Sequence, residues 1–262
     1  MTRQIAFQYV GGKSGVFKHL FPDNQDLPSF ERYYEPFVGG GAVFFYLARV
    51  HPSPAWISDT CPNVINTLIQ IRDNHVALTD LCIDNGRKFH DRRAYWCEVR
   101  DGYNDITDPL QKAAAFIFLQ NFSLYSGRGA AILPAKNARM PRPFQTLSDA
   151  LQNADISLTC FRSTPIRKNS LYYFDPPFFG QYHTYSTKFD LQDHYDLKLF
   201  CDKVNKKGSY FILSLGHHKV VQSLYDGYHL TRIARPPPTR SRGRGLGRMP
   251  TDGEVIVRNF KS

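Results

Sequence analysis

The sequence predicts an open α/β fold, a twisted parallel sheet with helices on both faces, and a mainly helical insertion in the middle of the chain. Short apolar runs rich in β-branched and aromatic residues end in acidic or glycine-containing turns, which is typical of buried parallel strands. These runs are Arg32–Pro36, Ala55–Asp59, Ser170–Asp175 and Ser209–Leu215. Apolar residues at helical spacing occur in Val64–Ile71 and Asp196–Val204, and this alternation favours a sheet covered by helices.

The middle of the chain has a different character. Asp108-Pro109 predicts the N-cap and first turn of a helix that continues to about Leu119. From Phe122 to Lys168, glycines, prolines and seven Lys/Arg against two Asp/Glu indicate an irregular basic region. We therefore expect a helical insertion over about residues 74–151. On this basis residues 1–73 and 156–262 form the α/β core, and residues 74–155 form the inserted part.

Charge and cysteine content narrow the class of protein. A net charge of +10 and a pI near 9.4 favour a polyanionic partner such as nucleic acid, although proteins without such a partner also carry such charge. The five cysteines are scattered without a C-x-x-C pair, which argues against a zinc site and against a disulfide framework. Because no signal peptide and no apolar run of about 18 residues is present, we expect a reducing, soluble compartment.

A glycine turn, Gly39–Gly41, follows the first expected strand, and Asp59 ends the next strand about twenty residues later. Glycines let a ligand approach the backbone closely, and a carboxylate so placed can accept both hydroxyl hydrogens of a ribose. The turn lacks the G-x-G-x-x-G spacing of a dinucleotide site and the Lys-Ser/Thr of a P-loop. A nucleoside without phosphates fits better. The alternative is a plain turn and an aspartate that caps the helix beginning near Pro62.

The most informative motif is Asp175-Pro176-Pro177-Phe178. A hydrophobic strand brings Asp175 to its carboxyl end, where ligands bind in open α/β sheets, and two prolines make the loop rigid and remove two N–H donors. The Asp175 side chain and the Pro176 carbonyl can accept both hydrogens of an exocyclic amine, stabilising positive charge as the nitrogen attacks a methyl sulfonium. A base must leave the duplex to reach this loop, and Phe178 can stack on it. The alternative is a simple strand-end turn.

Three blocks resemble the Dam-type, α-class family of DNA adenine-N6 methyltransferases. Gln8–Lys13 resembles the family's W-x-G-G-K motif, Glu35–Phe44 resembles E-P-F-V-G-G-G-x-V-F, and Asp175–Phe178 resembles D-P-P-Y. Tyr182–Ser186 and the closing strand Glu254–Asn259 show weaker similarity. The blocks stand in the α-class order, with the cofactor motif before the recognition region and the catalytic motif after it.

The resemblance implies a Rossmann-like, S-adenosylmethionine-dependent methyltransferase that modifies N6 of a flipped adenine in double-stranded DNA. It releases S-adenosylhomocysteine, needs no metal, and uses the insertion for target recognition. The catalytic residues would be Asp175, Pro176, Pro177 and Phe178. The cofactor-binding residues would be Tyr9, Gly12, Lys13, Glu35, Pro36, Phe37, Gly39, Gly41, Asp59, Phe161 and Asp175.

Three departures from the family pattern stand out. Tyr9 replaces the usual tryptophan, and Phe178 replaces the usual tyrosine; both keep an aromatic face. Leu119–Gly129 does not clearly match the family's L-N-R-x-x-Y-N-G-L-x-R segment. No GATC specificity is therefore assigned.

Two arginine-rich stretches are the expected DNA contacts. The first lies in the insertion and the second in a glycine- and proline-rich loop without acidic residues, which suits phosphate binding that weakens with salt. The predicted contacts are Arg128, Lys136, Arg139, Arg142, Arg240, Arg242 and Arg244. The first group can also read base edges in the major groove. The alternative is an ordinary solvated loop.

Other functions compete with this hypothesis. A cytosine-N4 methyltransferase uses the same amine chemistry but more often carries serine at position 175, and RNA or protein-glutamine methyltransferases use similar loops. A catalytically silent DNA-binding relative is the alternative from another class, and the glycine spacing argues against a dehydrogenase. The pair His217-His218 does not suggest a metal site. We expect a cytoplasmic monomer of prokaryotic or viral origin, with or without a companion restriction endonuclease.

Overall fold

The computed structural model describes residues 5–9, 13, 17–21, 27–123, 142–179, 189–233 and 253–261. The chain forms two compact units. Unit 1 comprises Met1–Ser14 and Val38–Cys160, and unit 2 comprises Gly15–Phe37 and Phe161–Ser262. Each unit is therefore discontinuous in sequence.

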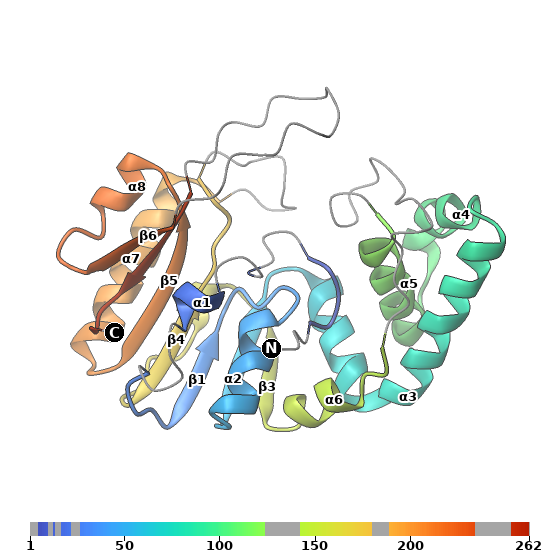
Figure 1. Ribbon diagram of the computed structural model, residues 1–262, viewed down its shortest axis with the longest axis horizontal. Coiled ribbons are helices and arrows are strands. Elements are labelled where there is room, and N and C mark those ends of the chain that lie inside the picture. Colours follow the sequence, from blue (N-terminus) through green and yellow to red (C-terminus); the bar gives the residue numbers. More distant parts are fainter. Residues whose placement is uncertain are drawn as a thin grey trace. The chain divides into compact units, whose positions relative to one another are not determined.

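The described strands have the order β3-β2-β1-β4-β5-β7-β6 in one seven-stranded sheet, flanked by helices (Figure 1). Their bounds are β1 Arg32–Glu35, β2 Ala55–Asp59, β3 Ala154–Leu158, β4 Ser170–Phe174, β5 Tyr210–Gly216, β6 His229–Ile233 and β7 Glu254–Arg258. In unit 1, β2 and β3 are parallel. In unit 2, β1, β4 and β5 are parallel, and β7 runs antiparallel to β5 and β6. The predicted α/β, Rossmann-like fold is confirmed.

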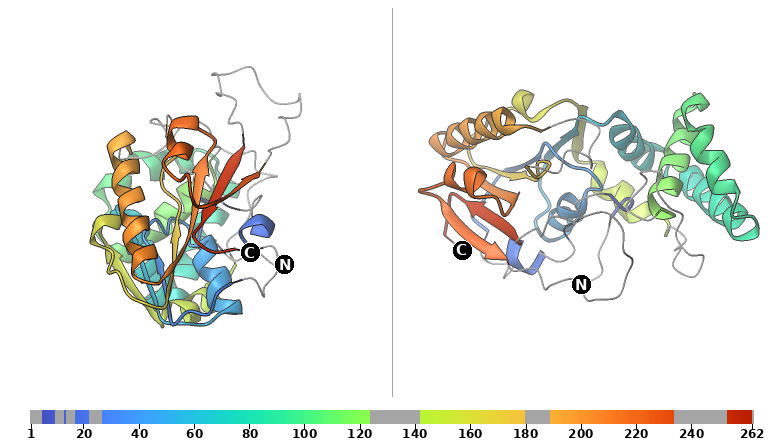
Figure 2. Two further views of the ribbon diagram at one scale, coloured as in Figure 1. Left: turned by 90° about the vertical axis from the view of Figure 1, so that its left-hand side faces the viewer. Right: turned by 90° about the horizontal axis from the view of Figure 1, so that it is seen from above.

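Unit 1 carries most of the described helices. They are α2 Ala42–Val50, α3 Pro62–Asp91, α4 Tyr95–Asp101, the 3-10 helix η2 Tyr103–Asp105, α5 Pro109–Asn121 and α6 Gln145–Leu151. Helices α3, α4 and α5 lie together in a cluster (Figure 2). Its core contains the aromatic side chains of Phe89, Trp96, Phe118 and Phe122, together with Leu119. Burial of these large rings stabilises a cluster whose outer faces are polar.

Helix α5 starts at the cap that the sequence predicts. The Asp108 carboxylate accepts a hydrogen bond from the Gln111 amide at 2.7 Å, and Pro109 occupies the first turn, where its missing N–H is not needed. The helix predicted from Asp108-Pro109 is thus confirmed, and it ends two residues beyond Leu119.

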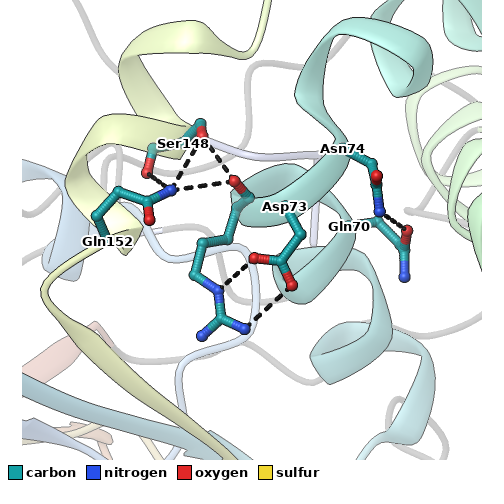
Figure 3. Close-up of polar contacts among 6 residues, drawn as sticks. Gln70, Asp73, Asn74, Ser148 and Gln152 are labelled. Atoms are coloured by element: carbon teal, nitrogen blue, oxygen red, sulfur yellow. Dashed lines mark hydrogen bonds and ion pairs between the residues drawn. The ribbon is translucent and has the colours of Figure 1, made fainter.

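Helix α3 is kinked at Asn74, where φ is −134° and ψ is 32°. Side chains from α6 support this point: Ser148 Oγ and Gln152 Nε2 donate to the Arg72 carbonyl at 2.8 and 3.1 Å (Figure 3). Asn74 Nδ2 donates to Gln70 Oε1 at 2.8 Å. The kink falls where the sequence analysis places the start of the insertion, and α6 returns the chain to the same place.

Unit 2 contains α1 Phe17–Leu20, the 3-10 helix η4 Phe161–Ser163, α7 Leu191–Lys206 and α8 Lys219–Ser223. Every residue of β4 is buried, as is every residue of β7. Helix α7 packs on β5 and starts with a capping box, in which Asp190 and Asp193 each accept the other's backbone N–H. This rigid start fixes the first turn of α7 next to η4.

The expectation of an irregular region from Phe122 to Lys168 is wrong for its second half. Helix α6 and strand β3 lie there. Strand β3 lies at one edge of the sheet and is partly exposed. Its polar residues Asp155 and Ser157 interrupt the apolar run that would indicate a buried strand. Strand β6, also at an edge and mostly exposed, carried too little apolar signal to be predicted.

Helix α3 has 30 residues, yet charged side chains occur along it. Within the described ranges, no helix is long and apolar enough to cross a membrane.

Candidate active site

In unit 1 the glycine turn needs glycine for two separate reasons. Gly39 and Gly41 have φ of +48° and +73°, in the left-handed region that favours glycine. A Cβ on Gly39 would lie 2.9 Å from Tyr9 Cδ1, and a Cβ on Gly40 would lie 2.8 Å from the Phe7 carbonyl oxygen. The turn closes through a bond from the Gly41 amide to the Val38 carbonyl at 2.8 Å. The turn therefore combines special backbone angles with close packing.

The N-terminal segment of unit 1 runs beside this turn. The Ala6 amide donates to the Gly40 carbonyl at 3.1 Å, and the ring of Tyr9 lies on Gly39. The Gln8 amide donates to Asn121 Oδ1 at 2.9 Å. The structure thus brings Tyr9 to the glycine turn. It also shows that Asn121, at the end of α5, holds the N-terminal segment.

Asp59 is anchored by backbone groups of unit 1. Its Oδ2 accepts from the Gly39 amide at 3.0 Å, and its Oδ1 accepts from the Cys61 amide at 2.9 Å. Burial raises the pKa of this carboxyl group, and the backbone N–H donors oppose that shift only in part. Helix α3 starts at Pro62 with Cys61 as N-cap. Asp59 therefore supports both the glycine turn and the helix start.

This arrangement fits a nucleoside ligand. Each carboxylate oxygen can accept about two hydrogen bonds, so the Asp59 carboxylate can accept a ribose hydroxyl in addition to the backbone N–H groups that anchor it. The glycine turn itself packs against Tyr9, Phe7 and Phe45, so the fit to a nucleoside rests on the Asp59 carboxylate. Lys13 is also in unit 1 and only 4% exposed.

In unit 2 the end of β1 carries a buried carboxylate. Glu35 is 2% exposed, and its Oε2 accepts from the Tyr33 hydroxyl at 2.6 Å. Burial and the nearby Glu35 charge raise the pKa of Tyr33 well above its usual value. The two residues are two apart on a strand and so point to the same face. That spacing was the available signal for the Tyr33–Glu35 pair, which the sequence analysis did not identify.

Aromatic side chains follow Glu35 in unit 2. Pro36 is buried, and the ring of Phe37 stacks on Phe161 with centroids 5.6 Å apart. Phe189 contacts both rings, with centroids 5.8 Å from Phe37 and 5.9 Å from Phe161. The three rings form an apolar group at η4.

An ion-pair network holds η4 against α7. The Arg162 guanidinium lies 4.7 Å from the centre of the Phe161 ring. It also pairs with Asp193 and Asp196 at 2.7 and 2.6 Å. The position of Phe161 therefore depends on the first two turns of α7.

The Asp175-Pro176-Pro177-Phe178 motif leaves the sheet directly after the buried strand β4. Burial raises the pKa of Tyr33 and of Tyr173 well above the usual value, and the Asp175 charge adds to both shifts. Tyr173 shares a hydrogen bond of 3.0 Å with Ser214 of β5. The side chains beneath the motif are thus hydrogen-bonded, and the sequence did not single them out.

Of the predicted DNA contacts, Arg142 lies within the described residues and is exposed. The other predicted DNA contacts and one predicted cofactor contact lie outside the described residues; they are Arg128, Lys136, Arg139, Arg240, Arg242, Arg244 and Gly12. Within the described part of the chain, no group of three His, Cys, Asp or Glu side chains is arranged to hold a metal ion.

Comparison with known families decides the class of enzyme. A family model described as D12 class N6 adenine-specific DNA methyltransferase matches residues 9–236. The chain belongs to this family. It is therefore an adenine-specific DNA methyltransferase that uses S-adenosylmethionine and acts on DNA, and the predicted adenine specificity is confirmed over the cytosine alternative.

Curated relatives agree with this assignment of the methyltransferase. The chain is 28% identical to Type II methyltransferase M.MjaIII of Methanocaldococcus jannaschii over 262 residues, 86% of this chain and 89% of that protein. It is 24% identical to Type II methyltransferase M1.LlaDCHI of Lactococcus lactis subsp. cremoris, covering 97% and 94% of the two chains. It is 25% identical to the DNA adenine methylase of Escherichia coli strain K12, covering 74% and 75%.

Proposed function

We propose that this methyltransferase modifies N6 of an adenine flipped out of double-stranded DNA, and that Asp175-Pro176-Pro177-Phe178 is its catalytic loop. The observation that carries this proposal is the placement of the motif. A fully buried strand ends in a carboxylate, and the next two residues cannot donate a backbone hydrogen bond. The loop is an acceptor-rich site suited to an amino group.

The cofactor-binding residues are proposed from the motifs that this chain shares with its family. Asp59 accepts the ribose hydroxyls, and the turn at Gly39 and Gly41 supports the methionine moiety. The anchored Asp59 carboxylate and the positive φ values of Gly39 and Gly41 support this role. The remaining proposed contacts are Tyr9, Gly12, Lys13, Glu35, Pro36, Phe37, Phe161 and Asp175. When bound, S-adenosylmethionine supplies an electrophilic methyl group on a sulfonium sulfur.

The proposed chemistry needs only hydrogen-bond acceptors and positioning from the protein. The Asp175 carboxylate and the Pro176 carbonyl accept the two amino hydrogens of adenine. This holds the nitrogen lone pair out of the ring system and stabilises the positive charge that develops on nitrogen. Pro177 keeps the loop rigid, and the Phe178 ring stacks on the flipped base.

DNA binding is assigned to the basic stretches. Arg142 is exposed in unit 1. It is proposed to contact DNA together with Arg128, Lys136, Arg139, Arg240, Arg242 and Arg244. Phosphate contacts by several of these side chains would make affinity fall steeply with salt. The inserted part, residues 74–155, is proposed to recognise the target sequence, with residues 1–73 and 156–262 as the catalytic core.

The biological setting follows by analogy only. Two relatives are named type II methyltransferases, which supports a companion restriction endonuclease for this enzyme as well. We further propose a monomer that needs no metal and works in the cytoplasm of a prokaryote or in a virus-infected cell.

The test is product analysis. The purified protein is incubated with labelled S-adenosylmethionine and mixed-sequence duplex DNA, and the DNA is digested to nucleosides. We expect label in N6-methyladenine, lost in Asp175→Ala, and sequencing of methylated sites then gives the target. Label in N4-methylcytosine, or in RNA but not DNA, would contradict the proposal. Cofactor binding without any transfer would indicate a silent DNA-binding relative.

A further inference from the structure

Strand β5 ends at Gly216, and the backbone angles do not explain why glycine stands there. Its φ lies outside the left-handed region, so an L-residue could adopt this conformation. Space explains it instead. A Cβ at position 216 would lie 3.1 Å from Cδ2 and Cγ of Phe178, and 3.2 Å from its Cβ. Such distances are shorter than ordinary carbon–carbon contacts of about 3.5–4.0 Å. Phe178 therefore packs directly on the backbone of Gly216.

Phe178 has little freedom to move away from a side chain at position 216. Pro176 and Pro177 precede it, and their rings fix φ at both positions. Phe179 follows it and is held by two histidine rings of the same unit. Its centroid lies 4.7 Å from that of His218, before α8, and 5.9 Å from that of His194 in α7. The chain on both sides of Phe178 is thus fixed.

We infer that Gly216 is a positioning residue for the target base, because its missing side chain sets where the Phe178 ring lies. This inference rests on the proposed role of Phe178 as the surface on which the flipped adenine stacks. The base would rest on Phe178 while its amino group meets Asp175 and Pro176. Gly216 therefore acts through Phe178, and contact with the substrate is not required of it.

The expected effect follows from geometry. A methyl group at position 216 must displace the Phe178 ring by a few tenths of an ångström. A displacement of about 1 Å in a reacting group can cost about 100-fold in rate, so Gly216→Ala should slow methyl transfer by about tenfold. Cofactor affinity should not change, because neither Gly216 nor Phe178 is among the proposed cofactor contacts. A larger side chain, as in Gly216→Val, should slow transfer further.

The experiment measures single-turnover methyl transfer to unmethylated plasmid DNA at saturating labelled S-adenosylmethionine. It compares wild type, Gly216→Ala, Phe178→Ala and the double variant. Cofactor affinity by calorimetry and melting temperature are measured on each protein. Leu199→Ala is the control, since Leu199 lies on α7 of the same unit, is 58% exposed and belongs to none of the proposed catalytic, cofactor or DNA contacts.

We expect Gly216→Ala to be about tenfold slower, with cofactor affinity and melting temperature unchanged and Leu199→Ala as fast as wild type. Phe178→Ala should lose about 10- to 100-fold, as removal of a stacking surface does. In the double variant, Gly216→Ala should add nothing, because the ring it displaces is absent. Additive losses, a normal rate for Gly216→Ala, or a loss explained by weaker cofactor binding would overturn the inference. A normal rate for Phe178→Ala would instead refute the proposed stacking role.

Discussion

The two carboxylates proposed to handle cofactor and substrate differ in what surrounds them. Asp59, in unit 1, accepts backbone hydrogen bonds on both oxygens, from Gly39 and from Cys61. Asp175, in unit 2, is followed by two prolines, which have no N–H to offer. The first carboxylate is fixed in place by the fold and suits a binding role. The second stands in a loop built from acceptors and suits a donor-rich substrate amine. The two carboxylates thus have different surroundings, the first suited to binding the cofactor and the second to the chemical step that we propose.

The largest expected effect is on the chemical step. In Asp175→Asn the side-chain amide presents N–H donors to an amine that is itself a donor, so one of the two acceptors is lost or opposed. Methyl transfer should fall by about 1,000-fold, the upper range for loss of one preorganised electrostatic contact. Single-turnover transfer from labelled cofactor measures this rate. A fall of less than about tenfold would remove Asp175 from the proposed role.

The buried His194 should make the folding stability of unit 2 sensitive to acid. His194, in unit 2, is fully buried and packs on Phe179 and Phe189, and neither ring nitrogen has a hydrogen-bond partner among the described residues. Burial lowers its pKa to about 4, against the opposing charges of Asp193 and Asp190, while His218 adds to the lowering. Its ring is therefore neutral at pH 7.

The sign of the pH effect follows from this shift. Between about pH 6.5 and pH 4 the unfolded chain binds a proton at His194 that the folded chain does not, so folding becomes less favourable as pH falls. The shift corresponds to about 3 kcal/mol. In His194→Phe this loss should disappear, which urea unfolding at pH 7 and at pH 4.5 measures. An identical pH dependence in wild type and variant would show that His194 is protonated equally in both states.

A smaller effect is expected on cofactor binding. Asp59→Ala removes the proposed acceptor of two ribose hydroxyls, and S-adenosylmethionine should bind about 30-fold more weakly, or about 2 kcal/mol. Calorimetric titration without DNA measures this affinity. Asp59→Asn keeps one acceptor oxygen and should fall between wild type and Asp59→Ala. Unchanged affinity in the alanine variant would leave Asp59 as a purely structural anchor for the glycine turn.

The smallest expected effect is on stability, at the hydrogen bond between Tyr33 and Glu35 in β1. Tyr33→Phe removes the hydroxyl that donates to the buried Glu35 carboxylate, and the free energy of unfolding should fall by about 1.5 kcal/mol. Tyr195→Phe, at a side chain 44% exposed, is the control and should change stability by less than about 0.5 kcal/mol. Equal values for the two variants in chemical denaturation would contradict a stabilising role for the Tyr33–Glu35 bond.

Central strands were predictable from sequence, and edge strands were not. Strands β1, β2, β4 and β5 were predicted within one or two residues, because burial on both faces leaves nearly continuous apolar runs. The edge strands β3 and β6 are partly exposed and contain polar residues, so their patterns resemble loops. The partition into two discontinuous units depends on contacts between distant segments, which no local pattern encodes.

The site was predictable where residue type and spacing carry the chemistry. The glycine turn has the positive φ values that its glycines implied, and Tyr9 lies on it. The helix-capping alternative for Asp59 also holds in part, since the carboxylate supports the start of α3 through Cys61. The space requirement at Gly216 was invisible, because it depends on where Phe178 packs after folding.

The measurement that tests the separation of binding from chemistry most directly is rescue by cofactor. Methyl transfer by Asp59→Ala and by Asp175→Asn is measured in single turnovers over a range of S-adenosylmethionine concentrations. We predict that Asp59→Ala approaches the wild-type rate at saturating cofactor, whereas Asp175→Asn remains slow at every concentration. Rescue of Asp175→Asn by cofactor, or a persistent defect in Asp59→Ala, would contradict the account.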